Sequence, residues 1–115
     1  MIDIPPPPPK LLADMAHYVW WKTPEEAAAD PARLIAQVMN IGRFEDVCRL
    51  FREVGRPTLR RIVENAEPGW FSQKPWAFWH VVLKIGDRMN PPPLPQRRLP
   101  PGADRELLFL RRRHA

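Results

Sequence analysis

The chain has 115 residues, enough for one small domain, and 16 of them are proline. Because proline cannot continue a helix or pair within a sheet, part of the chain cannot be ordinary packed secondary structure. The formal net charge is +5, and the single cysteine, Cys48, excludes an intramolecular disulfide and a thiolate-rich zinc site.

Proline and charge divide the chain at the same places. Eleven prolines lie in residues 1–10 and 91–115, and the second of these segments carries six arginines against two carboxylates. We therefore predict a polyproline leader over residues 1–10, a helical body over 11–88, a proline-rich linker over 89–102 and a basic amphipathic tail over 103–115. The body is almost neutral, which argues against a nucleic-acid platform built on it.

The first elements are predicted from proline and from capping residues. The leader is expected to be a solvated polyproline II rod, with docking in a peptide groove as the alternative. Apolar residues at helical spacing predict a helix of about three turns from Leu11. At Thr23-Pro24 a second helix should begin, because Thr23 can cap it and Glu26 completes a capping box. Asp30-Pro31 repeats this device and predicts a third helix.

Three further helices follow from spacing and from helix-ending residues. The third helix should end at Gly42, with Ile41 on its core side. Amphipathic spacing predicts a helix over Phe44–Val54, with Phe44 and Cys48 on the apolar face, and another over Pro57–Ala66. The last helix of the body should begin after the capping residue Ser72 and run to about Ile85, with Gly86 as its stop. The sequence alone indicates these helix ends and core-facing positions.

No segment alternates in the manner of a strand. The predicted fold is all-α: a compact bundle of five to six short helices with extended proline-rich tails. Residues 103–113 can form a further helix with acidic residues at its start and arginines at its end, but three turns alone are marginal in water. We expect this segment to fold on a partner. The longest uncharged apolar run is half of a membrane span, and the compartment is expected to be the cytoplasm.

The residues give no support for catalysis. The three histidines are not paired with each other or with Cys48 at metal-ligand spacing, and His80 is expected to be a packed core residue. No glycine-rich phosphate loop is present. We therefore predict no enzyme, no catalytic residue, no metal, no cofactor and no small-molecule substrate.

Large rings are the unusual feature of the body, and they are either core residues or part of a partner surface. The tail has three interpretations: docking on a protein through its apolar residues, contact with nucleic-acid phosphates through its arginines, or a solvated terminus. The candidate partner-binding residues are Trp20, Trp21, Trp70, Phe71, Phe78, Leu107, Leu108, Phe109, Arg111, Arg112 and Arg113.

Several motifs in residues 18–85 resemble those of a small bacterial protein family encoded beside AbiEii-type nucleotidyltransferase toxins. The motifs are W-x-(T/S)-P, G-x-(F/W)-E-D, and P-G-W-F followed by W-x-F-W. The segments of this chain that carry the resemblance are Tyr18–Ala27, Leu34–Gly42, Phe44–Val47, Glu67–Phe71 and Trp76–His80. Members of this family are presumed antitoxins. The resemblance implies a binding protein that neutralises a nucleotidyltransferase-like toxin by direct contact, and it does not extend to the tail.

The alternative function is a DNA- or RNA-binding transcriptional regulator. Val47–Val54, Gly55 and Pro57–Ala66 have the order of a helix-turn-helix, with Arg60 and Arg61 near the start of the second helix. Operator DNA would then be a partner in addition to the toxin, because antitoxins commonly repress their own operon.

Overall fold

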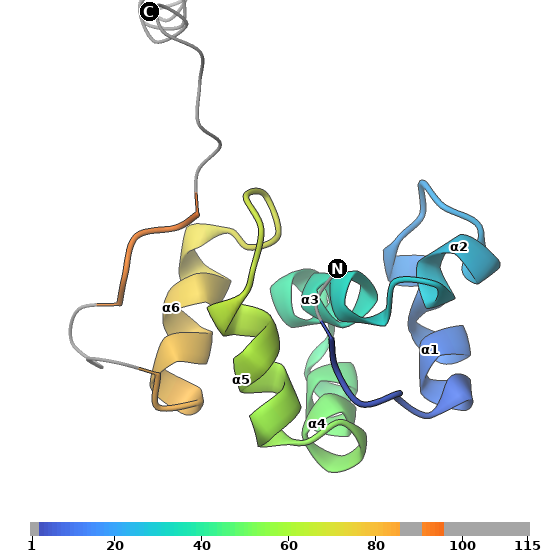
Figure 1. The fold of residues 1–115 in the computed structure, drawn as a ribbon, viewed down its shortest axis with the longest axis horizontal. Coiled ribbons are helices and arrows are strands. Elements are labelled where there is room, and N and C mark those ends of the chain that lie inside the picture. Colours follow the sequence, from blue (N-terminus) through green and yellow to red (C-terminus); the bar gives the residue numbers. More distant parts are fainter. Residues whose placement is uncertain (1–2, 86–90, 96–115) are drawn as a thin grey trace, which may run out of the picture.

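The structure is a computed structural model that describes residues 3–85 and 91–95. Its described part contains no strand (Figure 1). The elements are α1 (Pro9–Met15), a 3-10 helix η1 (Ala16–Tyr18), α2 (Pro24–Ala28), α3 (Pro31–Ile41), α4 (Phe44–Glu53), α5 (Arg56–Glu64) and α6 (Gln73–Val82). The prediction of an all-α bundle of five to six short helices is therefore confirmed.

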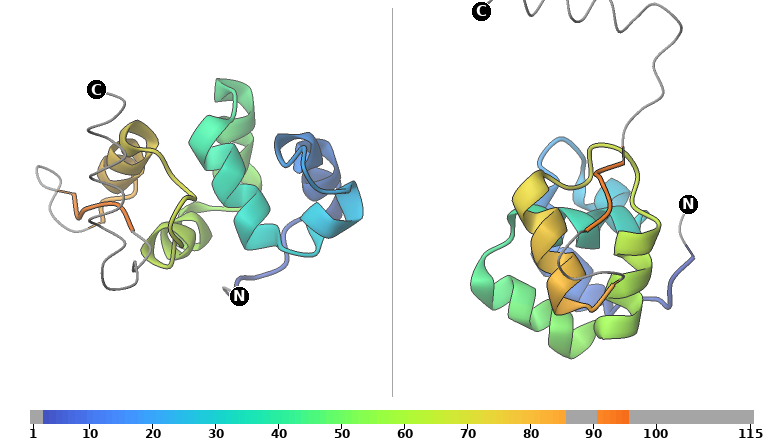
Figure 2. Two further views of the ribbon diagram at one scale, coloured as in Figure 1. Left: turned by 90° about the horizontal axis from the view of Figure 1, so that it is seen from above. Right: turned by 90° about the vertical axis from the view of Figure 1, so that its left-hand side faces the viewer.

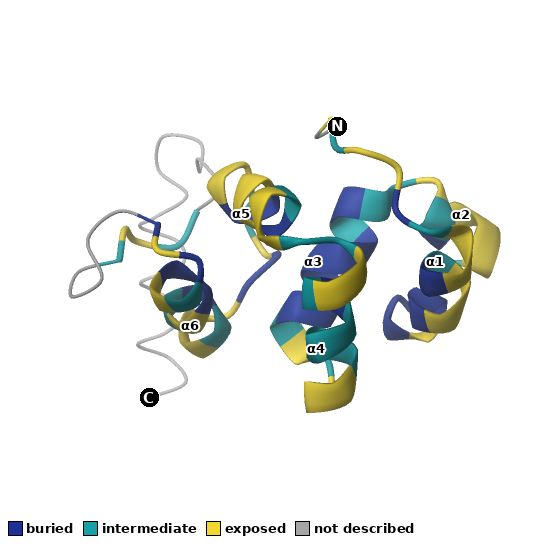
Figure 3. Ribbon diagram, turned by 90° about the horizontal axis from the view of Figure 1, so that it is seen from below, coloured by how far each residue is buried: buried dark blue, intermediate teal, exposed yellow. Residues whose placement is uncertain are grey.

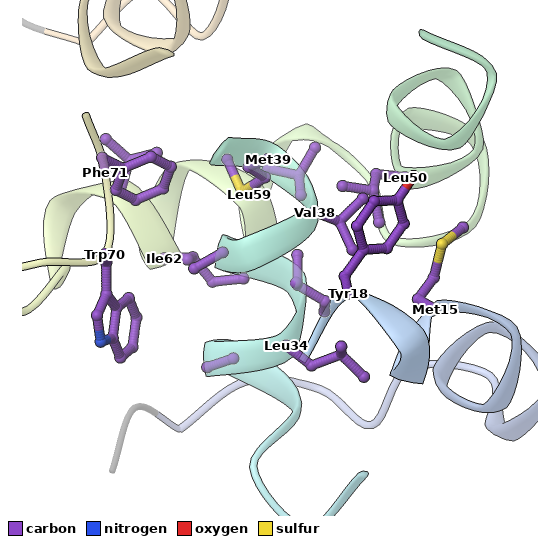
Figure 4. Close-up of a cluster of buried hydrophobic side chains, with 14 of the residues drawn as sticks. Met15, Tyr18, Leu34, Val38, Met39, Leu50, Leu59, Ile62, Trp70 and Phe71 are labelled. Atoms are coloured by element: carbon purple, nitrogen blue, oxygen red, sulfur yellow. The ribbon is translucent and has the colours of Figure 1, made fainter. Parts of the chain in front are cut away.

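Helix α3 is the centre of the bundle. It contacts every other helix and η1, and its side chains are buried around most of its circumference (Figures 1 and 3). Figure 4 shows the two halves of the core that meet on it. Met15, Tyr18 and Leu50 lie on one side of α3, and Ile62 and Trp70 lie on the other. The core is thus one cluster that joins both ends of the chain's folded part.

The predicted helix starts are confirmed at α2 and α3. Thr23 Oγ1 accepts a hydrogen bond from the Glu26 amide at 3.2 Å, and Asp30 Oδ1 accepts one from the Arg33 amide at 3.4 Å. Each helix has proline at its first position, where the missing amide hydrogen is not needed. These starts depend on contacts within one turn, which explains why the sequence predicts them.

The end of α3 follows the prediction, but for a different physical reason. Gly42 ends the helix in an extended conformation, with φ −68° and ψ 155°. A Cβ added to Gly42 would lie 2.3 Å from the Val38 carbonyl oxygen. Glycine is therefore required here by close backbone approach and not by a left-handed conformation.

The expected end of α6 is wrong. The helix ends at Val82, and Ile85 lies outside it. Lys84 adopts φ 55°, which lets the Ile85 amide donate to the His80 carbonyl at 3.0 Å and the Lys84 amide donate to Val81 at 3.2 Å. Lys84 thus takes the left-handed position that usually belongs to glycine, and Gly86 lies outside the described residues.

Both proline segments pack on the body where they are described. The first helix begins two residues before Leu11, at Pro9, and changes to η1 after Met15 instead of continuing for three turns. Ahead of it the leader runs past α3 (Figure 2), with Pro7 buried and Ile4 packed against the core. The leader is therefore not a solvated rod over these residues.

Candidate functional site

Exposed large apolar side chains form two surfaces on different elements. The first, which we call the tryptophan surface, consists of Trp20 and Trp21 in the turn between η1 and α2; these residues are 72% and 50% exposed. The second is an apolar groove of about 390 Å³ between the end of α3, the start of α4 and α6. We call it the phenylalanine groove, and its lining residues are Met39, Gly42, Phe44, Val47, Lys74, Pro75, Phe78 and Trp79.

The two rings of the tryptophan surface are in edge-to-face contact. Their centroids are 4.8 Å apart and their planes are inclined by 88°, which is a favourable arrangement of aromatic quadrupoles. The Arg33 guanidinium carbon lies 5.7 Å from the centroid of the Trp21 ring and 5.5 Å from that of Trp70. Both distances are within the range of a cation–π contact.

Arg33 therefore links the exposed turn to the core. Desolvation by burial lowers the pKa of Arg33, while nearby Asp30 and Glu67 act in the opposite direction. The side chain also donates to Gln37 Oε1 at 3.3 Å, and Gln37 is buried on α3. Trp21 is held on the body through these contacts, and Trp20 extends from it into solvent.

The phenylalanine groove is built where α6 crosses the end of α3. At its floor, Trp79 Nε1 donates to the Met39 carbonyl at 2.9 Å. The backbone amide and hydroxyl of Ser72 both donate to Asn40 Oδ1, at 2.9 and 3.2 Å. Ser72 therefore joins two helices. It is the N-cap residue of α6 as predicted, but its side chain makes no capping hydrogen bond. These bonds fix the two walls relative to each other.

The remaining wall is fixed by Tyr18. Its hydroxyl donates to the Asp46 carboxylate and accepts from the Arg43 amide at 3.1 Å, so it holds the first turn of α4. Burial, followed by the hydrogen bond to Asp46, raises the pKa of Tyr18 above its ordinary value of 10.0. Phe44 is the first residue of α4 and is 80% exposed on the rim of the groove, while Phe78 opposite is 50% exposed.

Ile41 and Phe44 correct the predicted core. Helical spacing places both on apolar faces, yet both are exposed. Ile41 is the last residue of α3 and Phe44 the first of α4, so both lie at the connection between these two helices. The groove could not be predicted from the sequence, because Phe44 and Phe78 are distant in the chain and only the fold brings them together.

The predicted partner-binding residues fall into three groups. Trp20, Trp21 and Phe78 are exposed. Trp70 and Phe71 are each only 7% exposed and belong to the core, where Trp70 supports Arg33. The tail residues Leu107, Leu108, Phe109, Arg111, Arg112 and Arg113 lie outside the described residues.

In the described part of the chain, every buried side-chain nitrogen and oxygen has a hydrogen-bond partner. His80 is buried and its Nδ1 donates to the Trp76 carbonyl at 2.7 Å, which confirms the prediction of a packed core histidine. Cys48, which helical spacing places on the apolar face of α4, is only half-buried. In residues 3–85 and 91–95, no group of three or more histidine, cysteine or acidic side chains is placed to hold a metal ion. A second hollow, of about 510 Å³, is lined mainly by prolines and contains one ionisable group, Glu25.

Comparison with known proteins gives no assignment: no family model, no curated protein and no solved structure matches the chain. Across the described part of the chain, each helix is too short or too polar to span a bilayer. The two exposed apolar surfaces are the candidate binding sites of the described part of the chain.

Proposed function

We propose that this chain is a non-catalytic binding protein that docks on a partner protein through its tryptophan surface. The observation that carries the proposal is the exposure of Trp20 beside Trp21, which Arg33 holds in place. Tryptophan is among the residues that contribute most to protein–protein binding when it becomes buried in an interface. An anchor already held in one position also loses little conformational freedom on binding.

The proposed partner is a nucleotidyltransferase-like toxin of the AbiEii type, which the chain would neutralise as an antitoxin. This identity depends on the resemblance of residues 18–85 to the antitoxin family, whose W-x-(T/S)-P motif includes Trp21. In this family motif the exposed ring and the cap of α2 are neighbours, since Thr23 follows Trp21 by two residues. Neutralisation by occlusion requires a binding surface and no chemistry from this chain.

The test is co-purification with the product of the adjacent gene, together with rescue of growth when that product is expressed. The variant Trp20→Ala should bind about 30-fold more weakly, because truncation of a central tryptophan costs about 2 kcal/mol or more. Val81→Ala is the matched control, since it also removes an exposed apolar side chain but on α6. The proposal fails if both variants bind and rescue as the unchanged chain does.

The alternative, binding to DNA or RNA, is favoured by one observation. Arg52, Arg56, Arg60 and Arg61 are exposed around the turn at Gly55 between α4 and α5. Two of them already have protein contacts: Arg56 donates to the Val82 carbonyl at 3.0 Å, and Arg60 pairs with Glu64 at 3.2 Å. A gel shift with the upstream DNA at about 150 mM salt that is lost in Arg60→Ala/Arg61→Ala would favour this alternative, since phosphate contacts are steeply salt-dependent.

A further inference from the structure

The phenylalanine groove is separate from the tryptophan surface and has a chemistry of its own. Its walls are apolar, its rim carries Phe44 and Phe78, and Lys74 lines one side. Arg43 is exposed directly before Phe44. Neither Lys74 nor Arg43 forms an ion pair with the described residues. An occupant that suits this groove has a few large apolar side chains and adjacent carboxylates.

The chain itself contains one segment of this kind. Residues 104–110 read Asp-Arg-Glu-Leu-Leu-Phe-Leu, so four consecutive apolar residues follow two carboxylates that are separated by Arg105. A volume of about 390 Å³ is appropriate for a few such side chains and too small for a long helix. The groove is therefore suited in size to this segment, and residues 104–110 carry a net charge of −1.

The attachment point of this segment is on a helix that forms the groove. Residues 91–95 lie against α6, where the Pro92 carbonyl accepts from Trp76 Nε1 at 2.6 Å and Leu94 packs on the core. Eight residues then lead from Pro95 to Ala103, and at about 3.1 Å per residue they reach roughly 25 Å. Helix α6 has ten residues and is therefore about 15 Å long. The connecting segment is long enough to pass around α6.

We propose that residues 104–110 dock in the phenylalanine groove of the same chain. The apolar residues 107–110 cover Phe44 and Phe78, and the carboxylates of Asp104 and Glu106 face Lys74 and Arg43. A short tether gives the segment an effective concentration in the millimolar range, so modest intrinsic affinity is sufficient. A partner that takes up either the groove or the tail must first displace this contact. Docking of residues 104–110 in the groove does not depend on the identity of that partner.

The experiment uses the full chain with one nitroxide label at its C-terminus. Cys48→Ser and Ala115→Cys place the label, and nuclear magnetic resonance measures paramagnetic broadening of amide signals. We expect strong broadening at Gly42, Phe44 and Phe78 and little at Trp20. Leu108→Asp should remove it, with a loss of docking of about tenfold or more from one apolar side chain. Leu99→Asp, in the connecting segment, is the matched control and should leave it unchanged.

Two further measurements distinguish docking of the tail in the groove of its own chain from docking in the groove of a second copy. Phe78→Asp, at a half-exposed position, should abolish the broadening from the groove side while circular dichroism stays unchanged. A second sample mixes chain that carries the nitroxide but no isotope with chain that carries the isotope but no nitroxide. In this mixture, docking within one chain gives no broadening. Broadening that also appears in the mixture would overturn the proposal in favour of a second copy. Broadening of the groove that is absent, or that persists equally in Leu108→Asp, would overturn it altogether.

Discussion

Tyr18 is the only tyrosine of the chain, and its hydroxyl joins two elements that lie 25 residues apart in the sequence. By accepting from the Arg43 amide and donating to Asp46, it satisfies a backbone donor at the start of α4 that has no side-chain cap. One buried hydroxyl therefore sets the position of Phe44. Tyr18 therefore shapes the groove from outside its lining, whereas the Trp79–Met39 bond shapes it from within.

Replacement of Tyr18 by phenylalanine tests this role through pH. Because the folded-state pKa of Tyr18 is raised, the folded chain favours the protonated hydroxyl. The associated stability is complete below pH 10.0, the ordinary value, and is lost as the pH rises through the folded-state pKa. Urea unfolding should show this loss in the unchanged chain, and Tyr18→Phe should lack it. The variant should also be about 1–3 kcal/mol less stable at neutral pH.

The two proteins differ only in the Tyr18 hydroxyl, so the difference between the two curves isolates its contribution. Identical pH dependence of the unfolding free energy in both would show that the hydroxyl makes no such contribution.

Lys84 gives a second prediction at the residue scale. It holds φ 55° at the end of α6, a conformation that costs an ordinary residue about 1 kcal/mol and glycine almost nothing. Lys84→Gly should therefore raise the free energy of unfolding by up to about 1 kcal/mol. Lys84→Ala removes the same charge but keeps the Cβ, and it should give no gain. Equal thermal midpoints for the two variants would contradict this account of the helix end.

Among the elements, the short turn between η1 and α2 owes its order to α3. The Arg33 side chain on α3 contacts two rings, Trp21 from the turn and Trp70 from the loop after α5. Three segments therefore meet at this one side chain. A planar guanidinium stacks on aromatic faces in a way that an ammonium group does not. The tryptophan surface is therefore part of the packing of α3 and not an independent loop.

Arg33→Lys keeps the charge and removes the planar group. We expect amide hydrogen exchange at residues 20–22 to become several-fold faster, because the turn loses the guanidinium contact of Trp21, which is worth about 0.5–1 kcal/mol. Arg61→Lys is the matched control, as Arg61 is exposed on α5. Equal exchange in the unchanged chain and in Arg33→Lys would mean that Trp21 is held by other contacts.

The helix boundaries show how much of the fold could be predicted from the sequence. The starts of α2 and α3 were predictable because Thr23 and Asp30 act within a single turn. The exposure of Phe44 was not, since helical spacing places it on the apolar face of α4 and its position depends on a tyrosine from another element. Spacing identifies an apolar face, but the neighbour that covers it is a property of the whole fold. The tryptophan surface could be proposed from composition, whereas the groove could not.

For the molecule as a whole, the folded unit includes a proline segment that composition assigns to a linker. Residues 91–95 carry three consecutive prolines and read as a spacer, yet Leu94 packs on the core and Pro92 accepts from the indole of Trp76. Trp76 is itself buried on α6. Proline adds stiffness here at low entropic cost, since its φ is already fixed. The segment closes one side of the bundle.

Two truncations measure the contribution of this segment to the whole fold. Ending the chain after Pro95 keeps the Trp76–Pro92 hydrogen bond and the packing of Leu94, whereas ending it after Asn90 removes both. The shorter chain should be less stable by about 2–4 kcal/mol, since it loses one hydrogen bond to a buried indole and part of one apolar contact. Both chains lack residues 104–110, so any docking of the tail cancels in the comparison. Urea unfolding followed by tryptophan fluorescence provides the measurement. If the two chains unfold at the same urea concentration, residues 91–95 contribute nothing to the fold and the domain ends with α6.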